Sequence, residues 1–223
     1  MIKLAWWKLL TVLLLFYTVW MGFMGKVPHL PILNETVRNL YFHVPMWFGM
    51  VLIFTASVWY SVQYLRTGNL EHDIKAGSYV EIGLIFGLLG MVTGSLWARY
   101  TWGEYWSNDP KQNASAVGMM IYLGYSILRG SISGEKERAR IASVYSIFAF
   151  PILIALIFIL PRLTDSLHPG NGGNPGFNPY DQAKHMRNVF YPSIFGWTLI
   201  GYWMADLLIR YKIVKQKTQL RSA

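Results

Sequence analysis

Residues 92–110 read VTGSLWARYTWGEYWSNDP and lie between two long apolar segments of the chain. Three tryptophans and two tyrosines fall within ten residues of this stretch, from Trp97 to Trp106. A connection between two membrane helices has no core of its own that these rings would fill. So many large rings predict a large, flat ligand at the membrane surface.

Around this stretch, six apolar segments approach the roughly 20 residues that a helix needs to cross a bilayer. Because backbone groups in lipid must be bonded within their own segment, each segment is expected to be a helix. The expected fold is all-α: one polytopic membrane domain over residues 1–223, a bundle of six transmembrane helices with an external aromatic loop at 97–113. The helices are expected at about 4–24, 44–65, 78–97, 114–130, 142–161 and 187–209.

Lysine and arginine orient the expected bundle. With a cytoplasmic N-terminus, 13 of the 20 basic residues fall on the inner side. This excess favours both termini in the cytoplasm and the aromatic loop on the outer (periplasmic) face of the inner membrane. The net charge of +9 then reflects contact with anionic headgroups and requires no nucleic-acid partner. The first apolar segment lacks a small-residue cleavage pattern and is expected to be retained as a helix.

Histidines are the candidate metal ligands, because the chain contains no cysteine. His72 is expected in an inner turn, and the other four histidines fall on the outer side. His43 and His168 flank the aromatic loop at the same expected depth, and His29 and His185 are alternatives in the same two loops. A neutral imidazole can bind haem iron or another transition metal. A single interfacial histidine more often serves polarity, and no compact zinc motif is present.

The end of the aromatic stretch indicates a helix start. Asp109 precedes Pro110, with Gln112 three positions after the aspartate, which is typical of an N-cap. Asp109 could also hold the loop beneath a ligand. Arg99 suits either interfacial anchoring or a ligand carboxylate, since a guanidinium bonds two oxygens at once. The same second role is open to Arg38, Arg162 and Arg187.

Glycines recur on one side of the expected helix 78–97, at Gly83, Gly87, Gly90 and Gly94. Small residues let membrane helices approach closely. The stripe therefore predicts tight helix packing, and it would also steady the helix that leads into the aromatic loop.

These residues resemble the tryptophan-rich "WWD" motif of the haem-handling proteins of cytochrome c maturation, the CcmC, CcmF and CcsA types. The family pattern is approximately WGxxWxWD, and residues 102–109 here read WGEYWSND. His43 in YFHVP and His168 in SLHPG match the two external histidines of that family. Asn108 departs from the pattern, because the family has a tryptophan before the aspartate. The length and helix number fit the CcmC type best, whereas the DPK after the motif leans toward the CcsA type.

The resemblance implies a haem chaperone and not an enzyme. It implies haem b held without a covalent bond, with His43 and His168 on the iron. The other implied contacts are Trp97, Arg99, Trp102, Gly103, Trp106 and Asp109. The implied recipient is a membrane-anchored haem carrier or, in the CcsA type, apocytochrome c. No nucleotide-binding loop is present, so an ATP-driven step would need partners such as ABC-transporter subunits.

Three other classes of protein are alternatives. A membrane haem or quinone oxidoreductase usually places its histidine ligands well inside the bilayer, and here the expected helix interiors hold no histidine. A non-catalytic structural subunit would use the aromatic loop to dock a partner. A small-molecule transporter ranks last, because the helices show few paired intramembrane charges.

Overall fold

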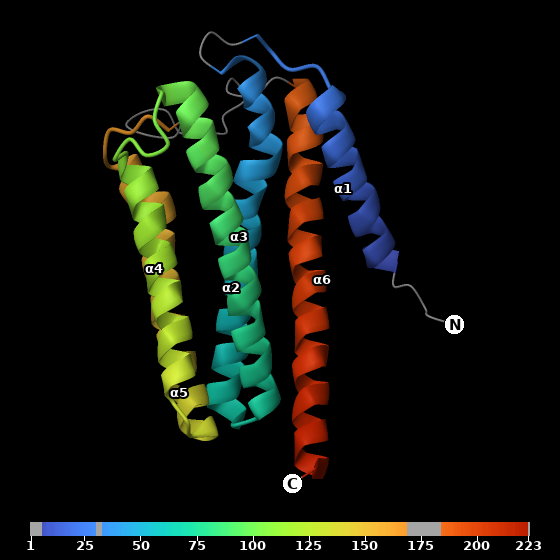
Figure 1. Cartoon of the computed structure of the whole chain (residues 1–223), viewed down its shortest axis with the longest axis vertical. Coiled ribbons are helices and arrows are strands. Elements are labelled where there is room, and N and C mark those ends of the chain that lie inside the picture. Colours follow the sequence, from blue (N-terminus) through green and yellow to red (C-terminus); the bar gives the residue numbers. More distant parts are fainter. Residues whose placement is uncertain (1–5, 30–32, 169–183, 223) are drawn as a thin grey trace.

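The computed structural model describes residues 6–29, 33–168 and 184–222, and every element in these ranges is helical (Figure 1). The α-helices are α1 (Trp6–Met24), α2 (Leu40–Thr67), α3 (Leu70–Trp102), α4 (Pro110–Ser131), α5 (Glu135–Ile154) and α6 (Lys184–Ser222). A 3₁₀ helix, Asn34–Asn39, leads into α2. The chain after α5 continues as a π-helix, Ala155–Ile159, and a 3₁₀ turn, Leu160–Arg162. The expected all-α class is confirmed.

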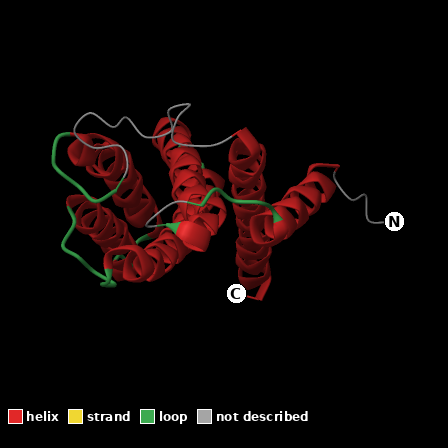
Figure 2. Ribbon diagram, turned by 90° about the horizontal axis from the view of Figure 1, so that it is seen from above, coloured by secondary structure: helices red, strands yellow, loops and turns green. Residues whose placement is uncertain are grey.

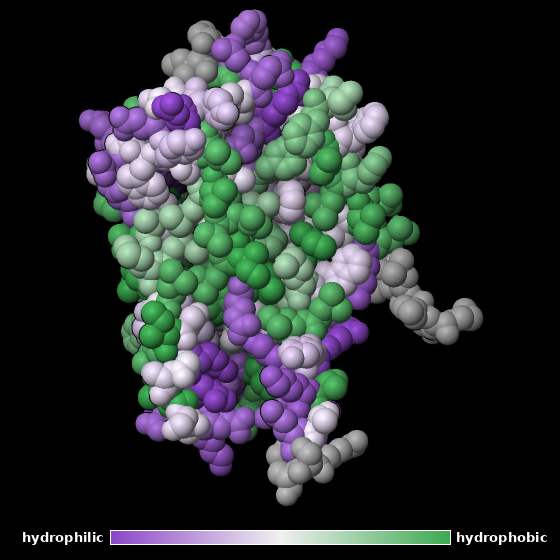
Figure 3. Space-filling view, viewed as in Figure 1, coloured by the Kyte–Doolittle hydropathy of each residue, from purple (hydrophilic) through white to green (hydrophobic). Residues whose placement is uncertain are grey.

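Four of the described helical segments are long and apolar enough to cross a membrane: Trp6–Met24, Asn34–Thr67, Leu70–Trp102 and Glu135–Arg162. The chain is therefore a multi-pass membrane protein. The surface shows the matching pattern, an apolar band between two polar ends (Figure 3). We propose that α4 and α6 also cross, because α4 packs on α3 and α5 and α6 packs on α1, α2 and α3.

Helices α2 to α6 stand nearly parallel, with α2 and α3 in the middle, α4 and α5 on one side and α6 on the other, where α1 packs on α6 at a tilt (Figures 1 and 2). Their shared core is built from large buried side chains such as Met50, Ile53 and Leu153. Phe54 of α2 stacks on Tyr122 of α4, with ring centroids 3.7 Å apart and planes 5° from parallel. This core fixes the ends of α2, α3 and α4, from which the site is built.

The glycine stripe of α3 packs against α2, as the sequence predicted. A Cβ added to Gly83 would lie 2.3 Å from Phe54, and one added to Gly90 would lie 2.9 Å from Trp47. The outermost member, Gly94, faces His43, whose Cε1 would be 2.5 Å from the added Cβ. The close approach of the two helices thus ends at a histidine of the expected site.

The helix boundaries differ from the expected ones, and the difference moves site residues. α2 begins at Leu40 and not at 44, so His43 lies in its first turn and not before it. α3 runs from Leu70 to Trp102 instead of 78–97, so Trp97 and Trp102 lie on its last turns and only 103–109 form the loop. The inner turn expected around His72 is likewise part of α3.

Three further helices extend beyond their expected bounds. α4 begins at 110 instead of 114, α5 begins at 135 instead of 142, and α6 covers 184–222 instead of 187–209. Hydropathy marks only the part of a helix in hydrocarbon, whereas backbone hydrogen bonding continues into the polar interface. At the start of α3, the Asn69 side chain caps the helix by accepting a bond from the Glu71 N–H.

Candidate functional site

The loop between α3 and α4 begins at a glycine turn. Gly103 ends α3 with a φ of 88°, a left-handed conformation that a residue without Cβ adopts at little cost. Arg99 donates a hydrogen bond to the carbonyl of Gly103, and its guanidinium lies 5.8 Å from the centre of the Tyr105 ring. Arg99 therefore closes the end of its own helix while its side chain stays exposed.

Asp109 ties two distant segments together. Its carboxylate accepts a bond from the Lys111 N–H at 2.9 Å, which confirms the predicted N-cap of α4. It also accepts bonds from the Ser166 hydroxyl at 2.8 Å, the Leu167 N–H at 2.7 Å and His168 Nδ1 at 2.9 Å. The side chain is almost fully buried. The segment after α5 is thus fastened to the start of α4 through one carboxylate.

The bond to Asp109 sets the chemical state of His168. Burial lowers the pKa of the His168 imidazole, and the neighbouring Asp109 carboxylate partly opposes this effect. Burial alone would raise the pKa of Asp109, but the bonds from Leu167 and Ser166 outweigh it and lower that pKa. The pair is therefore a carboxylate with a neutral imidazole. Nδ1 carries the hydrogen that Asp109 accepts, which leaves the lone pair on Nε2.

The His43 imidazole also has its lone pair on Nε2, but a backbone carbonyl and not a carboxylate orients it. Its Nδ1 lies 3.0 Å from the carbonyl oxygen of Gly90 and 3.2 Å from the hydroxyl of Thr93, both on α3. A carbonyl only accepts, so Nδ1 carries the hydrogen and the lone pair is again on Nε2. Among the described residues, neither histidine has a hydrogen-bond partner at Nε2.

Each histidine stands edge-on to a tryptophan of the motif. The ring centroids of His43 and Trp97 are 5.9 Å apart with an interplanar angle of 78°. Those of Trp102 and His168 are 4.7 Å apart with an angle of 73°. One imidazole–indole pair joins α2 to α3, and the other joins α3 to the segment after α5, so both pairs lie at the same end of α3.

Three other expected residues have no described contact with either histidine. Trp106 is exposed, and its indole N–H donates to Asn113 of α4 at 3.1 Å. His29 and His185 are exposed, and no described contact joins them to the aromatic loop. In the described part of the chain, no three His, Cys, Asp or Glu side chains group as a metal site would require.

A known protein family matches nearly the whole sequence of this chain. The family model for CcmC, described as "Heme exporter protein C", matches residues 2–223. The chain belongs to the heme exporter protein C family. This is a family of non-catalytic haem-handling proteins, as the sequence resemblance implied.

Curated relatives carry the same description. Heme exporter protein C of Bradyrhizobium diazoefficiens is 31% identical over 120 residues, 51% of this chain and 43% of that protein. Heme exporter protein C of Paracoccus denitrificans is 21% identical over 84% of this chain and 75% of that protein. A cytochrome c biogenesis protein CcsA of Pelargonium hortorum is 29% identical over 41% of this chain and 29% of that protein. The resemblance to both types is therefore confirmed, with the CcmC family model covering nearly the whole chain.

The family departure at Asn108 has a backbone explanation. Asn108 adopts a φ of 55°, in the left-handed region that asparagine enters more easily than a bulky residue. Its carbonyl accepts a bond from the Asn113 side chain at 3.1 Å. The loop here turns sharply into Asp109, and a tryptophan would be strained in this conformation.

Asn108→Trp is therefore expected to lower the free energy of unfolding by about 1 kcal/mol, the usual cost of forcing a bulky residue left-handed. Asn108→Gly, which adopts the same φ freely, should leave stability nearly unchanged. Denaturant unfolding of the detergent-solubilised variants measures both. A tryptophan variant as stable as the wild type would contradict the backbone explanation.

Several supporting residues were not predicted. Gln112 is buried, and its side-chain oxygen accepts bonds from the Ser107 N–H at 2.9 Å and the Ser107 hydroxyl at 3.0 Å. The sequence places Gln112 in the N-cap motif, but it does not indicate that Ser107 is its hydrogen-bond partner. Thr36 accepts a bond from the Trp97 indole N–H at 3.1 Å. Ser166 and Thr36 carry no local sequence signal, because their partners lie far away in the chain.

Proposed function

We propose that this protein binds haem b non-covalently at the outer face of the inner membrane and passes it on during cytochrome c biogenesis. His43 and His168 are the axial ligands in this proposal. One observation carries it: both imidazoles bond through Nδ1 and leave Nε2 free among the described residues. A hydrogen bond at Nδ1 fixes the tautomer and the ring orientation that a metal-binding histidine needs.

The indole geometry supports a flat ligand. The iron–Nε2 bond lies in the imidazole plane and along the porphyrin normal, so an axial imidazole stands perpendicular to the porphyrin. Trp97 and Trp102 are also nearly perpendicular to their histidines. Each indole can therefore lie parallel to a porphyrin held on that histidine. Such contacts contribute about 0.5–1.5 kcal/mol each beyond burial.

The other motif residues receive secondary roles. Trp106 would extend the aromatic platform, and Gly103 allows the turn on which the platform depends. The exposed guanidinium of Arg99 would meet a haem propionate, since arginine bonds carboxylates in pairs. Asp109 would orient His168. The excess of basic residues on the opposite side supports an outward-facing site with cytoplasmic termini.

The proposed recipient is a membrane-anchored haem carrier or apocytochrome c, with ABC-transporter subunits as the source of any ATP-driven step. Protein purified from haem-replete membranes is expected to show a Soret band. Mixed with a purified apo-carrier, it should lose that band as the carrier gains one, measured after separating the two proteins. Purified, folded protein without haem, which also fails to take up added haem, would contradict the proposal.

A variant that keeps both ligands tests their placement. In Gly94→Ala, the new methyl group would lie 2.5 Å from His43 Cε1 and 3.1 Å from Nδ1, so the ring must leave its bond to Gly90. Haem affinity is expected to fall about tenfold, because a metal-binding histidine that loses the hydrogen bond at its other nitrogen binds the metal more weakly. Gly130→Ala is the matched control, because nothing lies within 4 Å of its added Cβ. Haem titration of both variants decides, and equal affinities would count against His43 as a ligand.

A further inference from the structure

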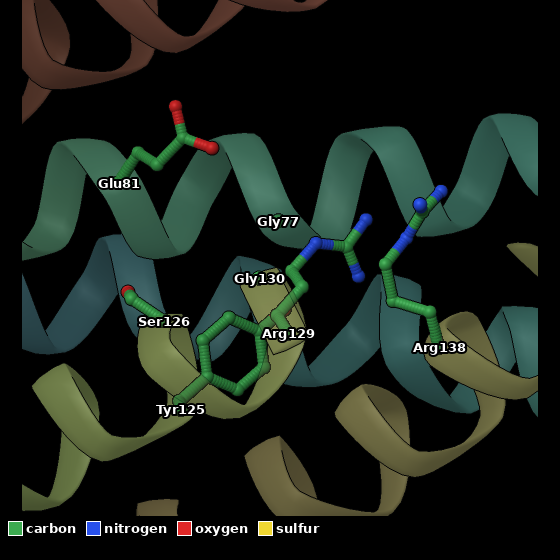
Figure 4. A pocket seen from close by; sticks show the side chains of 7 residues that line it. All are labelled: Gly77, Glu81, Tyr125, Ser126, Arg129, Gly130 and Arg138. Atoms are coloured by element: carbon green, nitrogen blue, oxygen red, sulfur yellow. The ribbon is translucent and has the colours of Figure 1, made fainter. Parts of the chain in front are cut away.

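A hollow lies at the end of the bundle opposite the aromatic loop. It has a volume of about 450 Å³ and opens between α3, α4 and α5 (Figure 4). Arg129 of α4 and Arg138 of α5 both extend toward α3 beside it. A second hollow, of about 250 Å³, shares these two arginines and adds Lys212 and Lys215 of α6. Four cationic side chains from three helices therefore surround one region.

The depth of this region follows from α3. Glu81, on the wall of the first hollow, and Trp102 lie on the same continuous helix. At 1.5 Å per residue they are about 31 Å apart along its axis. The hydrocarbon core of a bilayer is about 30 Å thick. With the aromatic loop at one interface, the hollow lies at the headgroup level of the other.

Part of the charge in this region is already neutralised. Arg129 bonds both oxygens of Asp73 at 2.6 Å, and the missing side chain of Gly77 makes room for its guanidinium. Lys212 bonds Glu81 at 2.5 Å. These two pairs hold α3 to α4 and α6 and leave no net charge. They shape the region but do not by themselves attract a ligand.

Two cations and one acid remain. Arg138 is 4.0 Å from Glu135, whose carboxylate also accepts a bond from the Gln216 side chain at 3.0 Å. Lys215 has no ion pair among the described residues. The region therefore keeps an excess of one positive charge. An anion of charge −1 would balance it.

Apolar side chains continue from the hollow into the membrane. Ile85 on α3 and Leu123 on α4 lie about one turn deeper than Glu81 and Ser126, and they are 42% and 50% exposed. A small soluble anion would not be stabilised by contact with these apolar side chains. A ligand with a charged head at the hollow and an apolar tail along α3 and α4 fits both parts.

We propose that this region binds an anionic phospholipid, with its phosphate group between Arg138 and Lys215. The phosphodiester of such a lipid carries the single negative charge that the region lacks. Its acyl chains lie along α3 and α4 beside Ile85 and Leu123. This site is independent of haem, because it lies at the other end of the bundle.

Native mass spectrometry of the full chain, with phosphatidylglycerol or phosphatidylcholine added in detergent, tests the proposal. The wild type is expected to bind phosphatidylglycerol more tightly than phosphatidylcholine. Arg138→Gln and Lys215→Gln are each expected to weaken phosphatidylglycerol binding about fivefold, as expected for one basic residue at a membrane surface. Arg138→Lys should keep most of the affinity. Arg140→Gln, an exposed cation on the same helix that does not line the hollow, is the matched control and should change nothing.

Three results would overturn the proposal. The first is equal affinity for the two lipids, and the second is a loss in Arg140→Gln as large as in Arg138→Gln. The third is displacement of phosphatidylglycerol by millimolar inorganic phosphate, which would assign the region to a soluble anion. If Arg138→Gln fails to fold, as judged by size-exclusion chromatography, Lys215→Gln and Arg138→Lys still decide the outcome.

Discussion

Replacing His43 and His168 together by alanine is expected to weaken haem binding by more than about 100-fold. At a metal site, loss of a residue that hydrogen-bonds a ligand lowers metal affinity by about 10–100-fold, and this double change removes both ligands themselves. The ratio of Soret absorbance to protein in the purified variant measures the effect. The indoles of Trp97 and Trp102 would remain, so weak residual binding of the porphyrin is expected.

The matched control is His29→Ala with His185→Ala. His29 lies in the connection before the 3₁₀ helix Asn34–Asn39 and His185 in the first turn of α6, and both are exposed and have no described contact with the aromatic loop. Their replacement should leave the haem content unchanged. A His43/His168 double variant with full haem content would end the axial-ligand assignment.

Asp109→Ala is expected to have the next largest effect, because one carboxylate serves both the fold and the site. The change removes the N-cap of α4, which costs about 1 kcal/mol. It also removes the acceptor of the part-buried hydrogen bonds from the Ser166 hydroxyl and the Leu167 N–H, at about 1 kcal/mol each. The free energy of unfolding should fall by about 3 kcal/mol, and haem affinity should fall about 10–100-fold as His168 loses its partner.

Denaturant unfolding and haem titration of the same Asp109→Ala preparation measure the two effects. Glu104→Ala is the control, since Glu104 is an exposed acid in the same loop. It should change neither quantity. An Asp109→Ala protein with wild-type haem affinity would show that the bond to His168 does not support the ligand.

Local features of the fold were predictable from the sequence. Runs of apolar residues indicated each helix, because helices in lipid must satisfy their own backbone groups. The Asp109-Pro110 pair indicated the start of α4, because a cap acts on residues two or three positions away. The glycine spacing in α3 predicted its close packing. Each of these signals acts within a few turns of one helix.

The ends of the helices and the partners within the site were not predictable in this way. α3 continues past the apolar run to Trp102, because hydropathy changes at the interface and backbone hydrogen bonding does not. The bond between His168 and Asp109 joins positions 59 apart, and nothing local to either residue indicates it. The contact of Gly94 with His43 depends on how α2 and α3 align. The family resemblance named the two histidines, but it did not indicate what orients them.

Hyperfine spectroscopy of the ferric haem complex, with histidine labelled by ¹⁵N, tests the central claim most directly. The account predicts couplings from two axial histidine nitrogens in the wild type and from one in His168→Ala. A wild-type complex with fewer than two such nitrogens would contradict it, as would His43→Ala and His168→Ala variants that each retain both couplings.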